Sequence, residues 1–135
     1  MDVLDKLQET TQGIRSLSEL KPRVGVILGS GLGAFVNHIQ VETVIPFSEI
    51  PHFATPSVEG HNGRLVLGQL HGVPIAIMQG RVHYYEGHSM EQVAYPVRTL
   101  AMLGIETVIL TNSAGGLDPN ICLLYTSDAA DDDRG

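Results

Sequence analysis

The stretch RVGVIL at residues 23–28, followed at once by GSGLG at residues 29–33, decides the class of fold. RVGVIL is short, apolar and rich in β-branched residues, which is typical of a buried strand. A second stretch of this kind, ETVILTN at residues 106–112, predicts another buried strand and also ends in small residues, SAGG at 113–116. Ligands collect beyond the carboxyl ends of strands in open α/β sheets, so we expect the two small-residue turns to lie together in a site.

Three more strands are predicted, and two of them flank a tight turn. VETVI at residues 41–45 alternates between apolar and polar positions, as a half-buried strand does. RLVLGQL at 64–70 and VPIAIM at 73–78 flank the dipeptide His71-Gly72. A two-residue connection that contains glycine is typical of a β-hairpin, and we expect one here.

Two helices complete the pattern. Residues 2–19 carry apolar side chains at helical spacing, which predicts a first helix. Ser89 with Gln92 three residues later matches a capping box, and the helix that it opens is expected to run to about Leu103 and to stop at Gly104. Strands that alternate with helices predict an α/β fold with a central mixed sheet flanked by helices.

Composition and charge narrow the class of protein. The chain has 135 residues, of which 43% are hydrophobic, and no apolar run approaches the roughly 20 residues that span a bilayer. Its net charge is −7, and nothing in the sequence forms the basic stripe expected of a nucleic-acid-binding protein. The single cysteine, Cys122, excludes an internal disulfide framework. The polar, acidic start is unlike a secretory signal, so we expect a soluble cytoplasmic protein with no nucleic-acid or membrane partner.

The last fifteen residues, ICLLYTSDAADDDRG, depart from the strand and helix pattern. They become acidic and of low complexity, without a further strand, turn or helix. We therefore expect residues 1–120 to form the domain and residues 121–135 to be a non-native or disordered acidic tail. The alternative is that this is an ordinary native tail of a kind common at chain ends.

The first small-residue turn is a candidate anion site. Its glycines allow backbone N–H groups to approach an anion, and Ser30 adds a hydroxyl donor. The motif lacks the Lys-Ser/Thr pair of a P-loop, and Leu28 stands where a nucleophile elbow has glycine. Taken alone, the segment is equally compatible with a plain tight turn.

The segment GRVHYYEG at residues 80–87 adds three functional side chains after a strand. Arg81 and His83 are two residues apart, so in an extended segment they point to one side, and Tyr85 continues that alternation. An arginine offers a planar donor fork to an oxyanion, and histidine a further donor. The alternative is a solvated loop with a surface arginine.

Two more glycine-flanked segments carry possible donors. His61 lies in GHNGR at residues 60–64, where it could fold over an anion or be a surface histidine. The N–H groups of Ser113 and Ala114 could bond an anion or a heterocycle. The other histidines show no metal-ligand spacing, so we expect no metal site.

Together the four motifs resemble one family. GSGLG, GHNGRL, QGRVHYYEG and TNSAGGL, in this order, look like purine nucleoside phosphorylase, in its trimeric branch that acts mainly on 6-oxopurine nucleosides. The resemblance covers the chain to about Asn120. It implies a truncated nucleoside phosphorylase fold, a homotrimer for the full-length protein, and phosphorolysis of purine (deoxy)ribonucleosides to free base and (deoxy)ribose 1-phosphate in purine salvage.

The resemblance also implies roles for individual residues. His83 and Glu86 would be catalytic, Tyr85 would contact the ribose, and no cofactor would be needed besides inorganic phosphate as co-substrate. The expected phosphate ligands are Ser30, His61, Arg81, His83 and Ser113, and the expected base pocket includes Ala114 and Gly115.

Because the family continues beyond the TNSAGGL motif with the residues that recognise the purine, we expect residues 1–135 alone to be inactive. The alternatives are a non-catalytic phosphate-binding fragment or a relative that acts on methylthioadenosine or xanthosine.

Overall fold

The computed structural model describes residues 1–29, 31–55, 63–82, 84–112 and 117–120. In these ranges the chain forms two α-helices, five strands and three short 3-10 turns. In chain order the elements are α1 (Val3–Leu17), β1 (Val24–Leu28), η1 (Gly33–His38), β2 (Gln40–Pro46), η2 (Phe47–Glu49), β3 (Arg64–Leu70), β4 (Val73–Gln79), η3 (Tyr84–Glu86), α2 (Met90–Met102) and β5 (Thr107–Leu110).

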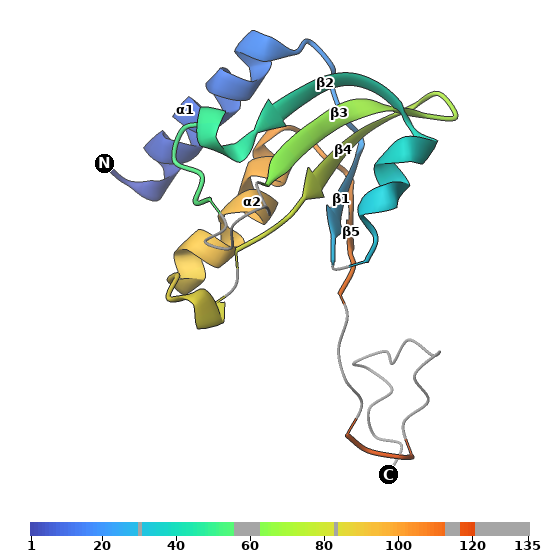
Figure 1. Cartoon of the computed structure of the whole chain (residues 1–135). Coiled ribbons are helices and arrows are strands. Elements are labelled where there is room, and N and C mark those ends of the chain that lie inside the picture. The colour runs from blue at the N-terminus through green and yellow to red at the C-terminus, as the bar shows by residue number, and fades with distance from the viewer. Residues whose placement is uncertain (30, 56–62, 83, 113–116, 121–135) are drawn as a thin grey trace.

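The five strands form one mixed sheet in the order β2-β3-β4-β1-β5 (Figure 1). β1 is parallel to both of its neighbours, β4 and β5, whereas β3 is antiparallel to β2 and β4. The predicted mixed sheet flanked by helices is therefore confirmed.

Local sequence signals set the ends of several elements as predicted. The hairpin between β3 and β4 turns at His71 and Gly72, whose φ angles of 51° and 80° are the left-handed pair that such a turn requires. At the start of α2, Ser89 and Gln92 form both hydrogen bonds of the capping box. At its end, Gly104 has a φ of 88°, and its N–H donates to the Ala101 carbonyl oxygen at 3.0 Å.

Hydrophobic side chains cover both faces of the sheet between β2 and β1. On one face, Ile14 of α1 and Leu100 of α2 pack with Ile27, Leu67 and Met78 from the strands. On the other face, Val36 of η1 packs with side chains of β1, β3 and β4, which are Val26, Leu28, Val66, Ile75 and Ile77. The two α-helices and η1 thus lie on opposite sides of the sheet (Figure 1).

The prediction that the stretch at 106–112 is a buried strand is wrong. The strand is shorter, Thr107–Leu110, and every residue of it is exposed. Val108 is 38% exposed, Ile109 47% and Leu110 60%. The reason is position: β5 is the last strand of the sheet, and none of its residues belongs to either hydrophobic core cluster of the described ranges.

Candidate functional site

The four segments that carry the motifs adjoin the same end of the sheet, where β1, β4 and β5 end and β3 begins. β1, β4 and β5 run in the same direction and end in register, with Leu28 opposite Gln79 and Ile27 opposite Leu110. β3 runs the other way and begins there, with Arg64 opposite Gln79. The flanks of all four motifs therefore lie at the carboxyl ends of the parallel strands, where ligands bind in sheets of this kind. This confirms that the two small-residue turns begin side by side.

Thr111 joins the first of these turns to the last. Its hydroxyl accepts a hydrogen bond from the N–H of Gly29 at 2.7 Å and donates to the carbonyl oxygen of Ile27 at 2.9 Å. A Cβ atom at Gly29 would lie 2.9 Å from the Cα of Asn112, so only glycine allows this approach. The turn after β1 and the segment after β5 are thus held together at their bases.

Gln79 makes the corresponding link at the end of β4. Its Oε1 accepts from Nε of Arg64, at the start of β3, and its Nε2 donates to the carbonyl oxygen of Gly33 at 3.2 Å, in the turn after β1. Sequence reasoning singled out neither Gln79 nor Thr111 for a role in the site. The only signal for each was its position between a strand and a motif, because their partners are distant in sequence.

The segment after β4 does not continue as an extended chain. Gly80 and Gly87 have φ angles of 97° and 92°, and between them residues Tyr84–Glu86 form the turn η3. The predicted alternation that placed Tyr85 on the same side as Arg81 is therefore wrong, because a 3-10 turn does not alternate. Tyr85 is 82% exposed, whereas Arg81 is partly buried.

Glu86 turns back toward the start of α2. Its side chain is 9% exposed, and its Oε2 lies 3.7 Å from Nε2 of His88, whose side chain is 18% exposed. This Nε2 is buried and has no hydrogen-bond partner among the described residues. A carboxylate and an imidazole thus lie near each other, a few residues after Arg81.

The remaining predicted site residues lie outside the described ranges. This applies to Ser30, His61, His83, Ser113, Ala114 and Gly115, and their roles stay predictions.

No group of three His, Cys, Asp or Glu side chains that could hold a metal ion occurs in the described ranges. No helix in those ranges is long and apolar enough to cross a membrane.

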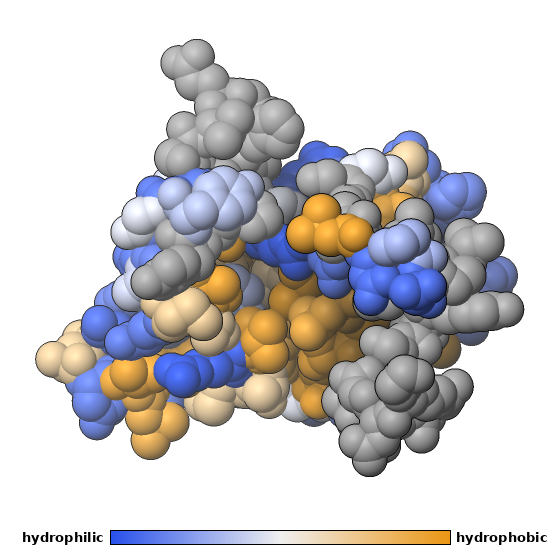
Figure 2. Space-filling view, turned by 90° about the horizontal axis from the view of Figure 1, so that it is seen from below, coloured by the Kyte–Doolittle hydropathy of each residue, from blue (hydrophilic) through white to orange (hydrophobic). Residues whose placement is uncertain are grey.

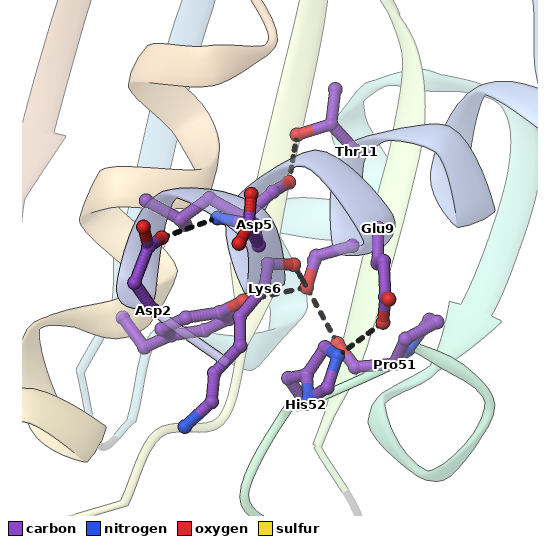
Figure 3. A network of polar contacts seen from close by, with 10 residues as sticks. Asp2, Asp5, Lys6, Glu9, Thr11, Pro51 and His52 are labelled. Carbon is purple, nitrogen blue, oxygen red and sulfur yellow. Dashed lines mark hydrogen bonds and ion pairs between the residues drawn. The ribbon is translucent and has the colours of Figure 1, made fainter.

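Residues Pro51 and His52, which precede the His61 segment in the chain, make hydrogen bonds to helix α1. His52 Nε2 lies 2.7 Å from Glu9 Oε2 on α1 (Figure 3). The carbonyl oxygen of Pro51 accepts a hydrogen bond from the Thr10 hydroxyl at 2.7 Å. The same hydroxyl shares a 2.7 Å hydrogen bond with the hydroxyl of Tyr95 on α2. Burial raises the pKa of the Tyr95 phenol above its ordinary value.

Seen from the side toward which β1 and β5 run, hydrophobic residues gather in a hollow near the middle of the surface, with polar residues around it (Figure 2). A separate open cleft of about 590 Å³ lies at the opposite edge, between the ends of α1 and α2. It is lined by Arg15, Leu20, Lys21, Pro22, Arg23, Leu103 and Gly104 and contains none of the motif residues.

Comparisons with known proteins agree with this geometry. The sequence model of the phosphorylase superfamily matches residues 23–133. Purine nucleoside phosphorylase 1 of Geobacillus stearothermophilus is 46% identical over 112 residues, which are 83% of this chain and 41% of the relative.

Solved structures show the same likeness. A purine nucleoside phosphorylase in complex with ribose-1-phosphate superposes with a TM-score of 0.81 at 37% identity, over 89% of this chain and 44% of that one. The Schistosoma mansoni enzyme in complex with inosine gives a TM-score of 0.79 at 37% identity, over 89% of this chain and 42% of that one. The chain thus spans less than half the length of these proteins. It belongs to the phosphorylase superfamily, in which it resembles part of a purine nucleoside phosphorylase.

Proposed function

We propose that this chain is the N-terminal part of a purine nucleoside phosphorylase of the trimeric, 6-oxopurine-preferring branch, which works in the cytoplasm in purine salvage. The reaction splits purine (deoxy)ribonucleosides with inorganic phosphate into free base and (deoxy)ribose 1-phosphate. The observation that carries this proposal is the meeting of four motif-bearing segments at one sheet edge, joined through Thr111 and Gln79. The names of the similar proteins support it.

Phosphate is the nucleophile and the only co-substrate in this proposal, with no metal or organic cofactor. Cleavage of the N-glycosidic bond develops positive charge on the sugar. A phosphate oxygen forms the new bond to the anomeric carbon as the bond to the base breaks; the base leaves with the electron pair and takes up a proton, which in the overall balance is the one that hydrogen phosphate gives up. Much of the rate enhancement comes from orienting the anion beneath the ribose.

The proposed roles follow the motif positions. Arg81 supplies a planar fork to phosphate, Tyr85 contacts the ribose, and Glu86 supports the phosphate and sugar network beside His88. Phosphate would further be bound by Ser30, His61, His83 and the Ser113 backbone, and the base pocket would include Ala114 and Gly115.

The chain by itself is proposed to be inactive, because the residues that recognise the purine lie in the remaining length of the protein. The test is inosine phosphorolysis with and without phosphate, by residues 1–135 and by a single chain that joins residues 1–120 to the rest of the Geobacillus relative. We expect hypoxanthine release only from the joined chain and only with phosphate. Phosphate-dependent release by residues 1–135 would show that this part suffices. A phosphate-dependent thermal shift with no turnover in either chain would favour a non-catalytic phosphate-binding protein.

The role of Arg81 is tested in the same joined chain. Arg81→Ala removes a charge-assisted donor fork and is expected to weaken phosphate binding by about 1.5–3 kcal/mol, or roughly 10- to 150-fold. Arg98→Ala on the exposed side of α2 is the matched control and should leave phosphate affinity unchanged. Equal phosphate affinity in the two variants would remove Arg81 from the site.

A further inference from the structure

Gly87 and His88 join the turn η3 to α2, and the local backbone fixes where the His88 ring lies. Gly87 has a φ of 92°, in the left-handed region that glycine adopts without strain. Ser89, the residue after His88, is held as the N-cap of α2 by the capping box. Between these two fixed points the ring lies beside Glu86, with His88 Nε2 3.7 Å from Glu86 Oε2.

This contact between a carboxylate and an imidazole is largely shielded from water, because both side chains are mostly buried. His88 Nε2 is fully buried and has no hydrogen-bond partner among the described residues. Burying an unpaired polar atom is unfavourable, and burying a carboxylate is unfavourable unless positive charge or donors surround it. A proton on Nε2 places a positive charge against the carboxylate, which offsets part of the cost of burying both groups.

The charge of His88 depends on few neighbours in the described ranges. Glu86, from η3, is its one ion-pair partner there. Glu91, in the first turn of α2, is exposed. The N-terminal end of α2 carries a partial positive charge and disfavours a cation beside it. Because imidazole gains and loses its proton between about pH 5 and 8, the pair carries a charge balance that changes with pH.

We propose that His88 is a positioning residue for the anion site, which acts through Glu86: its positive charge balances this carboxylate and so strengthens the binding of phosphate. The proposal rests on the proposed function, in which Arg81 binds phosphate and Glu86 supports the phosphate and sugar network. A carboxylate without a cation beside it repels an incoming dianion, and a paired carboxylate repels it less. Phosphate affinity should therefore fall as the pH rises and His88 loses its proton.

The test measures the dissociation constant of inorganic sulfate at about pH 5.5 and about pH 8.5 in the single chain that joins residues 1–120 to the rest of the Geobacillus relative. Sulfate keeps both negative charges at the two pH values, whereas phosphate changes its protonation between them. Two variants fix the charge at this position, because His88→Gln is neutral and His88→Lys is positive throughout. Comparison at one pH cancels the contributions of other histidines.

We expect the wild-type chain to match His88→Lys at the lower pH and His88→Gln at the higher pH. The two variants should differ in sulfate affinity by about threefold or more. His38→Gln is the matched control, since His38 is an exposed histidine at the end of η1, on the other face of the sheet from α2, and it should follow the wild type. A role of His88 in shape alone would give no such exchange of behaviour between the two pH values.

A second measurement needs no ligand and covers a joined chain that fails to fold. In residues 1–135, urea denaturation of Glu86→Gln, His88→Gln and the double variant should show a coupling of about twofold or more in the folding equilibrium constant at the lower pH and none at the higher pH. Additive losses at both pH values, or equal sulfate affinities of His88→Lys and His88→Gln, overturn this proposal and leave the proposed function intact. A joined chain that folds but binds neither sulfate nor phosphate overturns both.

Discussion

β1 and β5 are neighbouring parallel strands of nearly the same composition, yet one is buried and the other is exposed. VGVIL of β1 has four buried residues, whereas TVIL of β5 has none. β1 lies between β4 and β5 beneath the helices, and β5 has a neighbour on one side only. Apolar composition therefore shows that a strand is suited to burial, and only the surrounding elements determine whether it is buried.

The comparison also separates two kinds of contribution to stability. The β1 side of the sheet buries side chains between two covering layers, with Ile27 at 5% exposure and Met78 at 0%. β5 adds backbone hydrogen bonds but less apolar burial, because its side chains stay 38–60% exposed at Val108, Ile109 and Leu110. The free energy of folding of residues 1–135 should therefore come mainly from β1, β3, β4 and their covers.

The largest expected effect comes from placing the same charge in each strand. Ile27→Asp buries an unpaired carboxylate and should lower the free energy of unfolding by about 4 kcal/mol or more. Ile109→Asp in the chain alone should lower it by about 1 kcal/mol or less, because this side chain is 47% exposed and the charge stays hydrated. Urea denaturation followed by circular dichroism measures both. Similar losses in the two variants would show that β5 is covered in solution.

A smaller effect is expected at the junction between the two strands. Thr111→Val keeps the shape of the side chain but removes the acceptor for the Gly29 N–H and the donor to Ile27. We expect a loss of about 1–2 kcal/mol in the free energy of unfolding. The amide of Gly29 should also exchange faster. Thr107→Val at the exposed other end of β5 is the control. An equal loss there would show that the two hydrogen bonds of the Thr111 hydroxyl do not stabilise the fold.

Local signals explain which features could be predicted from sequence. The His71-Gly72 turn, the Ser89–Gln92 capping box and the Gly104 stop depend on residues close in the chain, and all three are confirmed. The prediction that the two small-residue turns begin at the same end of the sheet followed from the α/β pattern, and the parallel pairing of β1 with β5 agrees with it. Family membership was likewise predicted from the motifs and confirmed.

Most of the features that were not predicted depend on residues distant in the sequence. The exposure of β5 depends on what packs beside it, and the links made by Gln79 and Thr111 join residues 46 and 82 positions apart. The turn η3 was misread because two glycines with positive φ interrupt a sequence that otherwise alternates. The domain boundary near residue 120 and the roles of Ser30, His61, His83 and Ser113 stay predictions.

The smallest expected effect is on the pH dependence of stability, and it tests the helical layer, which covers β1 but leaves β5 exposed. Tyr95 packs in the helical layer, where burial raises its pKa above the usual value near 10. Above pH 10 the unfolded chain therefore releases the phenol proton while the folded chain retains it, so the stabilisation present below that pH is lost as the pH rises toward the folded pKa. Urea melts between pH 8 and 11 should show a steeper decline for the wild-type chain than for Tyr95→Phe. Parallel declines would mean that the phenol is solvated, and that the cover over β1 is looser than its packing indicates.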